Sequence, residues 1–204
     1  MKEIRIDEGD CKGGILNLPD SDILYFPDFI EKKRADAYFQ EFREEVPWQQ
    51  DDIQVFGKVY PQPRLTALYG NNGKPYSYSN ITMQPHTFSD ALLEIKKNIE
   101  TKTNAMFTTC LLNLYRDGKD SNGWHADNEK ELGVNPVIAS VTLGQERYFH
   151  LKHRNDKDLK RKILLQHGSL LLMQGPTQHH WLHQIPKTAK PIGERINLTF
   201  RVIA

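Results

Sequence analysis

From Met106 to the C-terminus, the hydrophobic positions favour strands rather than helices. Short apolar or alternating segments follow one another with turns between them and with no helical period. Strands at such spacing are typical of an all-β sandwich or barrel. The expected strands cover residues 107–115, 137–143, 148–152, 162–165, 169–174, 181–185 and 195–202. The C-terminal half is therefore predicted to form a jelly-roll-like core.

The N-terminal half carries helical periodicity. Asp28 followed by Glu31 resembles a capping box that opens a helix. Apolar residues from 35 to 46 then recur at helical spacing, and Pro47 ends the pattern. A second helix is expected over residues 89–102.

Strand and turn signals surround these two helices. Residues 23–26 favour a short strand, and residues 54–60 alternate around Gly57 as in a hairpin. The turn-forming run 70–73 breaks up an aromatic segment. The fold class is therefore α+β. Residues 1–21, which are polar and rich in glycine, are expected to form a loose arm ahead of a single domain over residues 22–204.

Composition fits one globular domain. Of 204 residues, 38% are apolar and 26% are charged, which argues against disordered and fibrous proteins. No apolar run is long enough for a transmembrane helix, and the N-terminus lacks the apolar region of a secretory signal. The two cysteines, Cys11 and Cys110, form no disulfide framework, and we expect free thiols in a reducing cytosol.

Two histidines and one aspartate suggest a metal centre. His125 and Asp127 are two residues apart, so they face the same side of an extended segment. A histidine-rich strand, His179-His180-Trp181-Leu182-His183, can supply a third ligand, and strand parity alone does not exclude His179. Two histidines and one carboxylate with three open positions form the facial triad of non-heme Fe(II) oxygenases. An isolated H-x-D pair is seldom a metal site.

The last predicted strand adds a second chemical feature. Arg195, Asn197, Thr199 and Arg201 share one face because their spacing is even. Solvent exposure of that face would explain the alternation. Two arginines on one face also suit a dicarboxylate, since guanidinium groups bind carboxylates in a fixed geometry. Asn113 and Tyr115 alternate in the same way on an earlier strand.

The ordered pattern N-x-Y-x-D-G…H-x-D…H…R-x-N-x-T-F-R resembles the AlkB family of Fe(II)/2-oxoglutarate-dependent dioxygenases. The resemblance covers roughly residues 22–203. It implies a double-stranded β-helix, or jelly-roll, core over 106–204. It also implies that residues 22–105 provide helices and a β-hairpin lid that recognises the nucleotide.

The resemblance assigns the site residues. Fe(II) would be held by His125, Asp127 and His183, with family spacing to Arg195 favouring His183 as the third ligand. 2-Oxoglutarate would be held by Asn113, Tyr115, Arg195, Asn197 and Arg201, with Arg195 at its distal carboxylate. The implied reaction uses O2, converts 2-oxoglutarate to succinate and CO2, and removes an N-alkyl group from a base as an aldehyde.

The segment before the core implies the substrate. Residues 55–58, 63–64, 69–70 and 76–79 resemble the branch that repairs double-stranded DNA by base flipping. Phe56 would fill the gap left by the flipped base. Tyr76, Tyr78, His125 and Glu129 would contact a base such as 1-methyladenine or 3-methylcytosine. Core packing for Phe56 and cross-strand packing for the two tyrosines are the plainer interpretations.

Basic residues extend the implied DNA contacts. Residues 147–162 hold seven Lys or Arg against two acids, although the net charge of the chain is only +1. The candidate DNA-binding residues are Lys58, Arg64, Lys152, Arg154, Lys157 and Arg161. A solvated loop is the alternative for this basic run.

Three interpretations of the function stay open. The first is a DNA demethylase that acts as a monomer in the cytoplasm or the nucleus and has no membrane partner. The second is an RNA or tRNA demethylase with the same core. The third is a non-catalytic nucleic-acid-binding module. Asn128, Ala126 and Leu182 depart from the duplex-repair pattern, so strand preference is left open.

Overall fold

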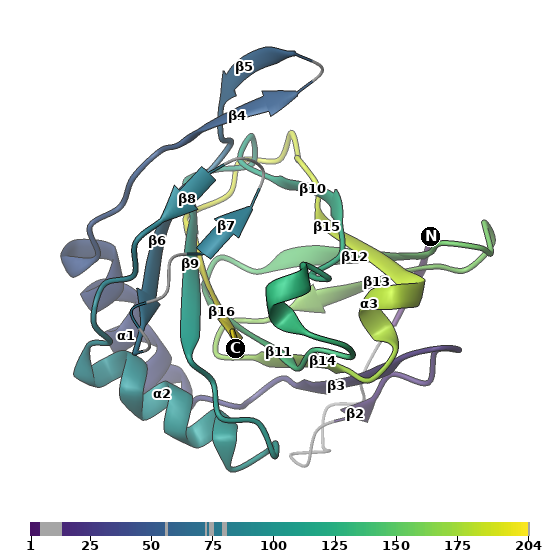
Figure 1. Ribbon diagram of the computed structural model, residues 1–204, viewed down its shortest axis with the longest axis horizontal. Coiled ribbons are helices and arrows are strands. Elements are labelled where there is room, and N and C mark those ends of the chain that lie inside the picture. The colour runs from purple at the N-terminus through teal and green to yellow at the C-terminus, as the bar shows by residue number, and fades with distance from the viewer. Residues whose placement is uncertain (5–13, 56, 72, 74–75, 79–80, 204) are drawn as a thin grey trace.

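A computed structural model places two facing β-sheets at the centre of the molecule (Figure 1). It describes residues 1–4, 14–55, 57–71, 73, 76–78 and 81–203. One sheet has five strands in the order β1-β13-β12-β15-β10, and the other has seven in the order β2-β3-β14-β11-β16-β9-β6. Two further pairs, β4-β5 and β7-β8, stand apart from the sheets.

The strands are short in the N-terminal half and longer in the C-terminal half. They are β1 Lys2–Glu3, β2 Gly14–Ile15, β3 Asp22–Phe26, β4 Asp52–Val55, β5 Lys58–Pro61, β6 Leu65–Gly70, β7 Tyr76–Tyr78, β8 Ile81–Met83, β9 Thr109–Tyr115, β10 Asn122–His125, β11 Ile138–Gly144, β12 Arg147–His153, β13 Lys160–Leu165, β14 Leu170–Gln174, β15 Trp181–Ile185 and β16 Arg195–Arg201. The helices are α1 Lys32–Glu45, α2 Asp90–Glu100 and α3 Thr177–His180, with a 3-10 turn over Lys130–Leu132.

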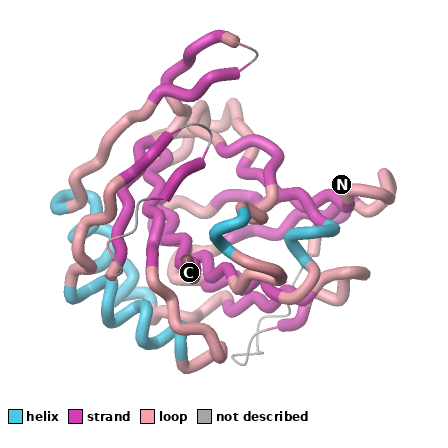
Figure 2. The backbone as a smooth tube through the Cα atoms, in the orientation of Figure 1, coloured by secondary structure: helices cyan, strands magenta, loops and turns pink. Residues whose placement is uncertain are grey.

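Both long helices lie on one side of the molecule, against the seven-stranded sheet (Figure 2). The apolar residues of β16 (Ile196, Leu198 and Phe200) are fully buried in the core that this sheet forms with α1 and α2. Alternate residues of β9 and β11 join the same core. The apolar face of each central strand therefore packs on helices, and its other face turns toward the second sheet.

That other face is polar and yet buried. Every residue of β16 is buried, including Arg195, Asn197, Thr199 and Arg201. Around them, a second apolar cluster fills the remaining space between the sheets, from β9, β12, β14 and β15. Solvent exposure of this face, the simpler of the two expectations from the sequence, is therefore wrong. Burial of so many polar groups is costly unless they are hydrogen-bonded to one another or to a ligand.

The predicted hairpin around Gly57 is confirmed. Strands β4 and β5 pair antiparallel, and Gly57 has a φ of 78° at the turn. The hairpin projects beyond the two sheets (Figure 1). Strands β7 and β8 form a second antiparallel pair. These two pairs lie in the segment that the family resemblance assigns to a lid.

The seven strands predicted in the C-terminal half are confirmed, and no strand end differs from its predicted position by more than two residues. Helix α1 begins later than expected, because Glu31 rather than Asp28 is its N-cap and accepts from the backbone N–H of Lys33. Its end before Pro47 agrees with the prediction. The second helix is confirmed with Ser89 as its N-cap.

The N-terminal arm differs from the expectation of a loose segment. Lys2 and Glu3 pair in parallel with β13, and Gly14 and Ile15 pair with β3. Leu16 is buried, and the indole of Trp181 donates to the carbonyl of Pro19. The described parts of the arm are therefore attached to both sheets. Among the described helices, none is long and apolar enough to cross a membrane.

Candidate active site

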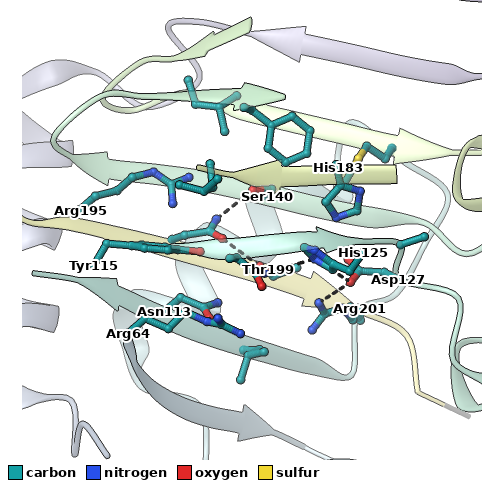
Figure 3. A pocket seen from close by; sticks show the side chains of 18 of the residues that line it. Arg64, Asn113, Tyr115, His125, Asp127, Ser140, His183, Arg195, Thr199 and Arg201 are labelled. Atoms are coloured by element: carbon teal, nitrogen blue, oxygen red, sulfur yellow. Dashed lines mark hydrogen bonds and ion pairs between the residues drawn. The ribbon is translucent and has the colours of Figure 1, made fainter. Parts of the chain in front are cut away.

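The candidate metal ligands converge between the two sheets. His125 ends β10, and His183 lies opposite it in the register of the antiparallel β10-β15 pair. Asp127 follows two residues after His125. Ligand atoms of the three side chains all lie within 4.8 Å of one another, and Asp127 and His183 are buried. Figure 3 shows them at one end of a pocket.

Hydrogen bonding prepares His125 as a ligand. Its Nδ1 lies 2.7 Å from the carbonyl oxygen of Gly123. A carbonyl only accepts, so Nδ1 carries the proton and Nε2 keeps its lone pair. This Nε2 lies 3.8 Å from Oδ1 of Asp127. The tautomer therefore directs the unprotonated nitrogen toward the other candidate ligands.

Asp127 is held from two directions. Nη2 of Arg201 donates to its Oδ1 at 3.0 Å, and its backbone N–H donates to Oε1 of Gln178 at 2.9 Å. Burial alone would raise the pKa of Asp127. The charge of Arg201 and the neighbouring imidazoles outweigh burial and lower the pKa to about 2. The carboxylate is therefore ionised at neutral pH.

His183 is kept neutral. Burial, and then the neighbouring His125, lower the pKa of His183 to about 3. The ring of Phe149 stacks on it with centroids 5.1 Å apart. A neutral imidazole and an ionised carboxylate are the protonation states that metal binding requires.

Arg195 lies at the other end of the pocket (Figure 3). Its Nη2 donates to Oγ1 of Thr142 at 2.9 Å, and its guanidinium lies 5.2 Å from the ring centroid of Tyr115. Burial lowers the pKa of Arg195 to about 10, so it remains charged at neutral pH. Its buried Nε and Nη1 atoms have no hydrogen-bond partner among the described residues. A buried cation with two such donors fits a carboxylate.

A network of polar side chains joins the two ends. Nδ2 of Asn197 donates to Oγ of Ser140 at 2.8 Å, and Oγ1 of Thr199 donates to Oδ1 of Asn197 at 3.2 Å. Asn113 is the register partner of Asn197, and Tyr115 that of Arg195. All five residues expected to hold 2-oxoglutarate, namely Asn113, Tyr115, Arg195, Asn197 and Arg201, line the pocket.

The donor set fits a divalent iron with a dicarboxylate beside it. Two histidines and one carboxylate form one end, and a buried arginine with unused donors forms the other. The residues between them offer amide and hydroxyl groups. Ser140, Thr142 and Gln178 also shape the site, although no motif in the sequence marked them. The even spacing of Ser140 and Thr142 on a predicted strand was the available signal.

A second histidine cluster contains Asp20, His153 and His180, with ligand atoms within 4.8 Å of one another. Here Nδ1 of His153 accepts from the backbone N–H groups of Asn155 and Asp156. The proton of the neutral ring therefore sits on Nε2, which points toward Asp20 at 3.3 Å. That tautomer disfavours metal binding, and the cluster is better described as a histidine–carboxylate contact.

The other candidate for the third ligand is excluded by the fold. His179 and His180 belong to the short helix α3 rather than to strand β15. His179 is exposed, and the ring of His180 stacks on His153. The expectation of one continuous histidine-rich strand is therefore wrong, and its parity argument does not apply to His179.

The candidate base-contacting residues are placed only in part. Glu129 and His125 both line the pocket. Tyr76 and Tyr78 lie on β7, but their side chains are outside the described part of the chain. Phe56, the expected wedge at the hairpin turn, also lies outside the described residues.

The candidate DNA-binding residues divide into exposed and buried ones. Lys58 is exposed on the projecting hairpin, and Arg154 and Lys157 are exposed between β12 and β13. Lys152 is half-buried, with its Nζ 4.4 Å from the ring centroid of Trp124, and Arg161 is half-buried on β13. Arg64, the remaining candidate, is buried inside the pocket, and its side chain is bonded to Asn113.

Comparisons with known proteins agree with this geometry. Residues 22–201 match the 2OG-Fe(II) oxygenase superfamily model. The alpha-ketoglutarate-dependent dioxygenase alkB homolog 3 of Bos taurus is 41% identical over 90% of the chain and 66% of its own length. The DNA oxidative demethylase ALKBH2 of Homo sapiens is 38% identical over 84% of the chain and 70% of its own length. The chain thus spans slightly less than two thirds of the alkB homolog 3 sequence.

A solved structure supports the fold. The oxidoreductase of the 2OG-Fe(II) oxygenase family from Burkholderia pseudomallei superposes with a TM-score of 0.62 at 14% identity, covering 98% of this chain and 93% of that one. The Fe(II), 2-oxoglutarate and O2 expected from the sequence are those of the matched superfamily. The chain belongs to the AlkB family of the 2OG-Fe(II) oxygenase superfamily.

Proposed function

We propose that this chain removes N-alkyl groups from nucleic-acid bases by oxidation, with alkylated DNA as its substrate and 1-methyladenine and 3-methylcytosine as its target bases. The catalytic domain of this proposal covers residues 22–204, acting as a monomer. One observation carries the proposal: a buried pocket has a His-Asp-His cluster at one end and the partly unbonded Arg195 at the other.

The residues of the pocket have separate roles in this proposal. His125, Asp127 and His183 hold the iron, which, with 2-oxoglutarate and O2 bound, supplies the oxidising chemistry. Arg195 binds the distal carboxylate of 2-oxoglutarate, since its pKa of about 10 keeps it protonated. Asn113 and Tyr115 offer an amide and a hydroxyl to the same molecule. Arg201 keeps Asp127 ionised and oriented.

Apolar walls limit the water in the pocket. Leu111, Phe149 and Ile185 line it from β9, β12 and β15. Phe149 also fixes the plane of His183 by stacking. A site with little bulk water strengthens the hydrogen bonds and ion pairs that position the reactants.

The names of the relatives support a nucleic-acid substrate. One is called a DNA oxidative demethylase, and the described hairpin β4-β5 projects beyond the sheets (Figure 1). An enzyme that acts on a base in a duplex must turn that base out of the stack. We assign Tyr76, Tyr78 and Glu129 to the flipped base, and Phe56 and Lys58 to the duplex that it leaves.

The deciding experiment is mass-spectrometric demethylation of an oligonucleotide that carries 1-methyladenine, single-stranded and in a duplex, with Fe(II) and 2-oxoglutarate. We expect loss of the methyl group from both, with strong activity on the duplex, and no activity for Asp127→Ala. An RNA oligonucleotide with the same lesion tests the alternative substrate. Succinate production without demethylation of any of these oligonucleotides would contradict the proposed substrate but agree with an oxygenase activity.

A further inference from the structure

Arg64 occupies a junction between three parts of the molecule. It lies three residues after the end of the projecting β4-β5 hairpin and directly precedes β6. In the register of β6 with β9, Leu65 lies opposite Leu114 and Thr66 opposite Asn113. Strand alternation then puts Arg64 on the pocket side of the sheet, as a diagonal neighbour of Asn113.

The contacts of Arg64 agree with this position. Its Nε donates to Oδ1 of Asn113 at 2.7 Å, and both side chains are buried, with 7% and 4% of their residues' surface exposed. Its Nη1 donates to the backbone carbonyl of Ser121 at 3.3 Å. The backbone N–H of Ser121 in turn donates to the carbonyl of Pro63 at 2.9 Å. Arg64 thus ties the base of the hairpin to β9 and to the loop that leads into β10.

The bond to Asn113 determines which way its amide faces. A guanidinium N–H only donates, so the amide atom that meets Nε must be the oxygen. The NH2 group of Asn113 is then left as the donor available to the pocket. With the amide reversed, its oxygen would face the carboxylate of a bound dicarboxylate and repel it. Figure 3 shows the two side chains together on one wall of the pocket.

We propose that Arg64 is a positioning residue for 2-oxoglutarate, which orients the amide of Asn113 so that its NH2 group donates to the cosubstrate. The inference rests on the proposed function only in taking 2-oxoglutarate as the molecule bound. It differs from the DNA contact that the sequence predicts for Arg64. Because the same residue anchors the hairpin, it also links the nucleotide-recognition segment physically to the cosubstrate site.

The test measures 2-oxoglutarate affinity without any nucleic acid. Isothermal titration of 2-oxoglutarate into Mn(II)-loaded protein compares the wild type with Arg64→Ala, Asn113→Ala and the double variant. Each single variant is expected to bind about tenfold more weakly or worse, because a hydrogen bond to a charged group is lost or misdirected. The double variant should bind no more weakly than the weaker single variant, since the two residues act through one amide.

Further variants separate positioning from damage to the fold. Arg64→Lys retains a donor and should recover part of the affinity. Arg34→Ala removes an exposed arginine of α1 and should leave the affinity unchanged. Thermal unfolding of every variant without ligand reports on the fold, and Mn(II) affinity reports on the metal ligands.

Three results would overturn the inference. One is 2-oxoglutarate affinity within twofold of wild type in Arg64→Ala, which would show that Arg64 does not position the cosubstrate. Another is additive losses in the double variant. The third is an equal loss of Mn(II) and 2-oxoglutarate affinity, which would indicate a general structural role. None of these depends on which nucleic acid is the substrate.

Discussion

The partner of one ring nitrogen distinguishes the two histidine clusters. In His125, Nδ1 meets the carbonyl of Gly123, so Nε2 is unprotonated and accepts from Nδ2 of Asn122 at 3.2 Å. In His153, Nδ1 accepts from two backbone N–H groups, so Nε2 bears the proton. Both clusters contain two histidines and an aspartate within 4.8 Å. Residue type and distance alone therefore do not distinguish a candidate metal centre from a histidine–carboxylate contact, whereas the tautomer does.

Acidification should destabilise the metal-free protein, because Asp127 and His183 have lowered pKa values of about 2 and about 3. In the unfolded chain these groups titrate near about 3.9 and 6.5. As the pH falls below about 6.5, the unfolded state binds protons that the native state does not bind. The free energy of unfolding therefore decreases progressively. The loss involves His183 first and Asp127 below about pH 4.

Thermal unfolding of chelator-treated protein between pH 7.5 and 5 would check this effect, at about half-unit steps. The variant His183→Gln should show a smaller decrease of the melting temperature over that range, since it lacks the buried imidazole. Equal pH dependence of the two proteins would contradict the assignment of the effect to His183.

At the level of elements, alternation in the sequence predicts the strands but not what covers them. In β16, the alternation of Ile196, Leu198 and Phe200 with polar residues identifies both faces. Only the structure shows that helices cover the apolar face and that the polar face is buried against the other sheet. The candidate metal and 2-oxoglutarate residues, which lie together in one pocket, could be proposed from the sequence because their spacing is short or matches an ordered motif.

Elements without periodicity were missed. Helix α3 has four residues, too few for a helical pattern, so its histidines were taken for part of β15. The buried position of Arg64 also escaped prediction, because it depends on the register of β6 with β9 rather than on the local sequence. The pairing of distant strands in this register could not be predicted from one amino-acid sequence.

Helix α3 has a role that follows from its one buried amide. Gln178 is fully buried, and its Oε1 accepts from the backbone N–H of Asp127 at 2.9 Å. We expect Gln178→Met, which keeps the volume but removes the acceptor, to weaken Mn(II) binding by about 10- to 100-fold, as is usual for groups that orient metal ligands. Electron paramagnetic resonance titration of Mn(II) measures this. The control is His179→Ala, which changes an exposed residue of the same helix. Equal Mn(II) affinities of the two variants would show that Gln178 does not orient Asp127.

The β4-β5 hairpin predicts a difference between duplex and single-stranded substrates. A wedge at its turn would occupy the space of a flipped base, a need that only the duplex creates. Phe56→Ala should therefore lower kcat/KM on a 1-methyladenine duplex by about tenfold more than on the single strand, a difference of about 1.4 kcal/mol. Val59→Ala, which shortens an exposed apolar side chain of the same hairpin, controls for lost apolar surface. Equal losses on both substrates would reject the wedge.

Over the whole molecule, stability and chemistry are divided between two cores. The core between the helices and the seven-stranded sheet is built from a large apolar cluster, whereas the core between the sheets surrounds the polar pocket. The first can compensate for the cost of burying polar groups in the second.

Charged residues are also divided between the interior and the surface. The net charge is +1, Arg64, Arg195 and Arg201 are buried, and exposed basic residues gather between β12 and β13.

This distribution of charge predicts a salt-dependent interaction with DNA that comes from a few exposed residues. If Arg154 and Lys157 each neutralise one phosphate, the slope of log K against log salt should become less steep by about 1.8 in Arg154→Gln/Lys157→Gln, since each contact contributes about 0.9 on duplex DNA. Fluorescence anisotropy with a labelled duplex at several salt concentrations measures the slope. Lys33→Gln/Lys97→Gln, which removes two exposed charges from α1 and α2, matches the change in net charge. If the local contacts matter, only the first pair flattens the slope; equal slopes in the two double variants would mean that overall charge, and not the loop between β12 and β13, attracts the DNA.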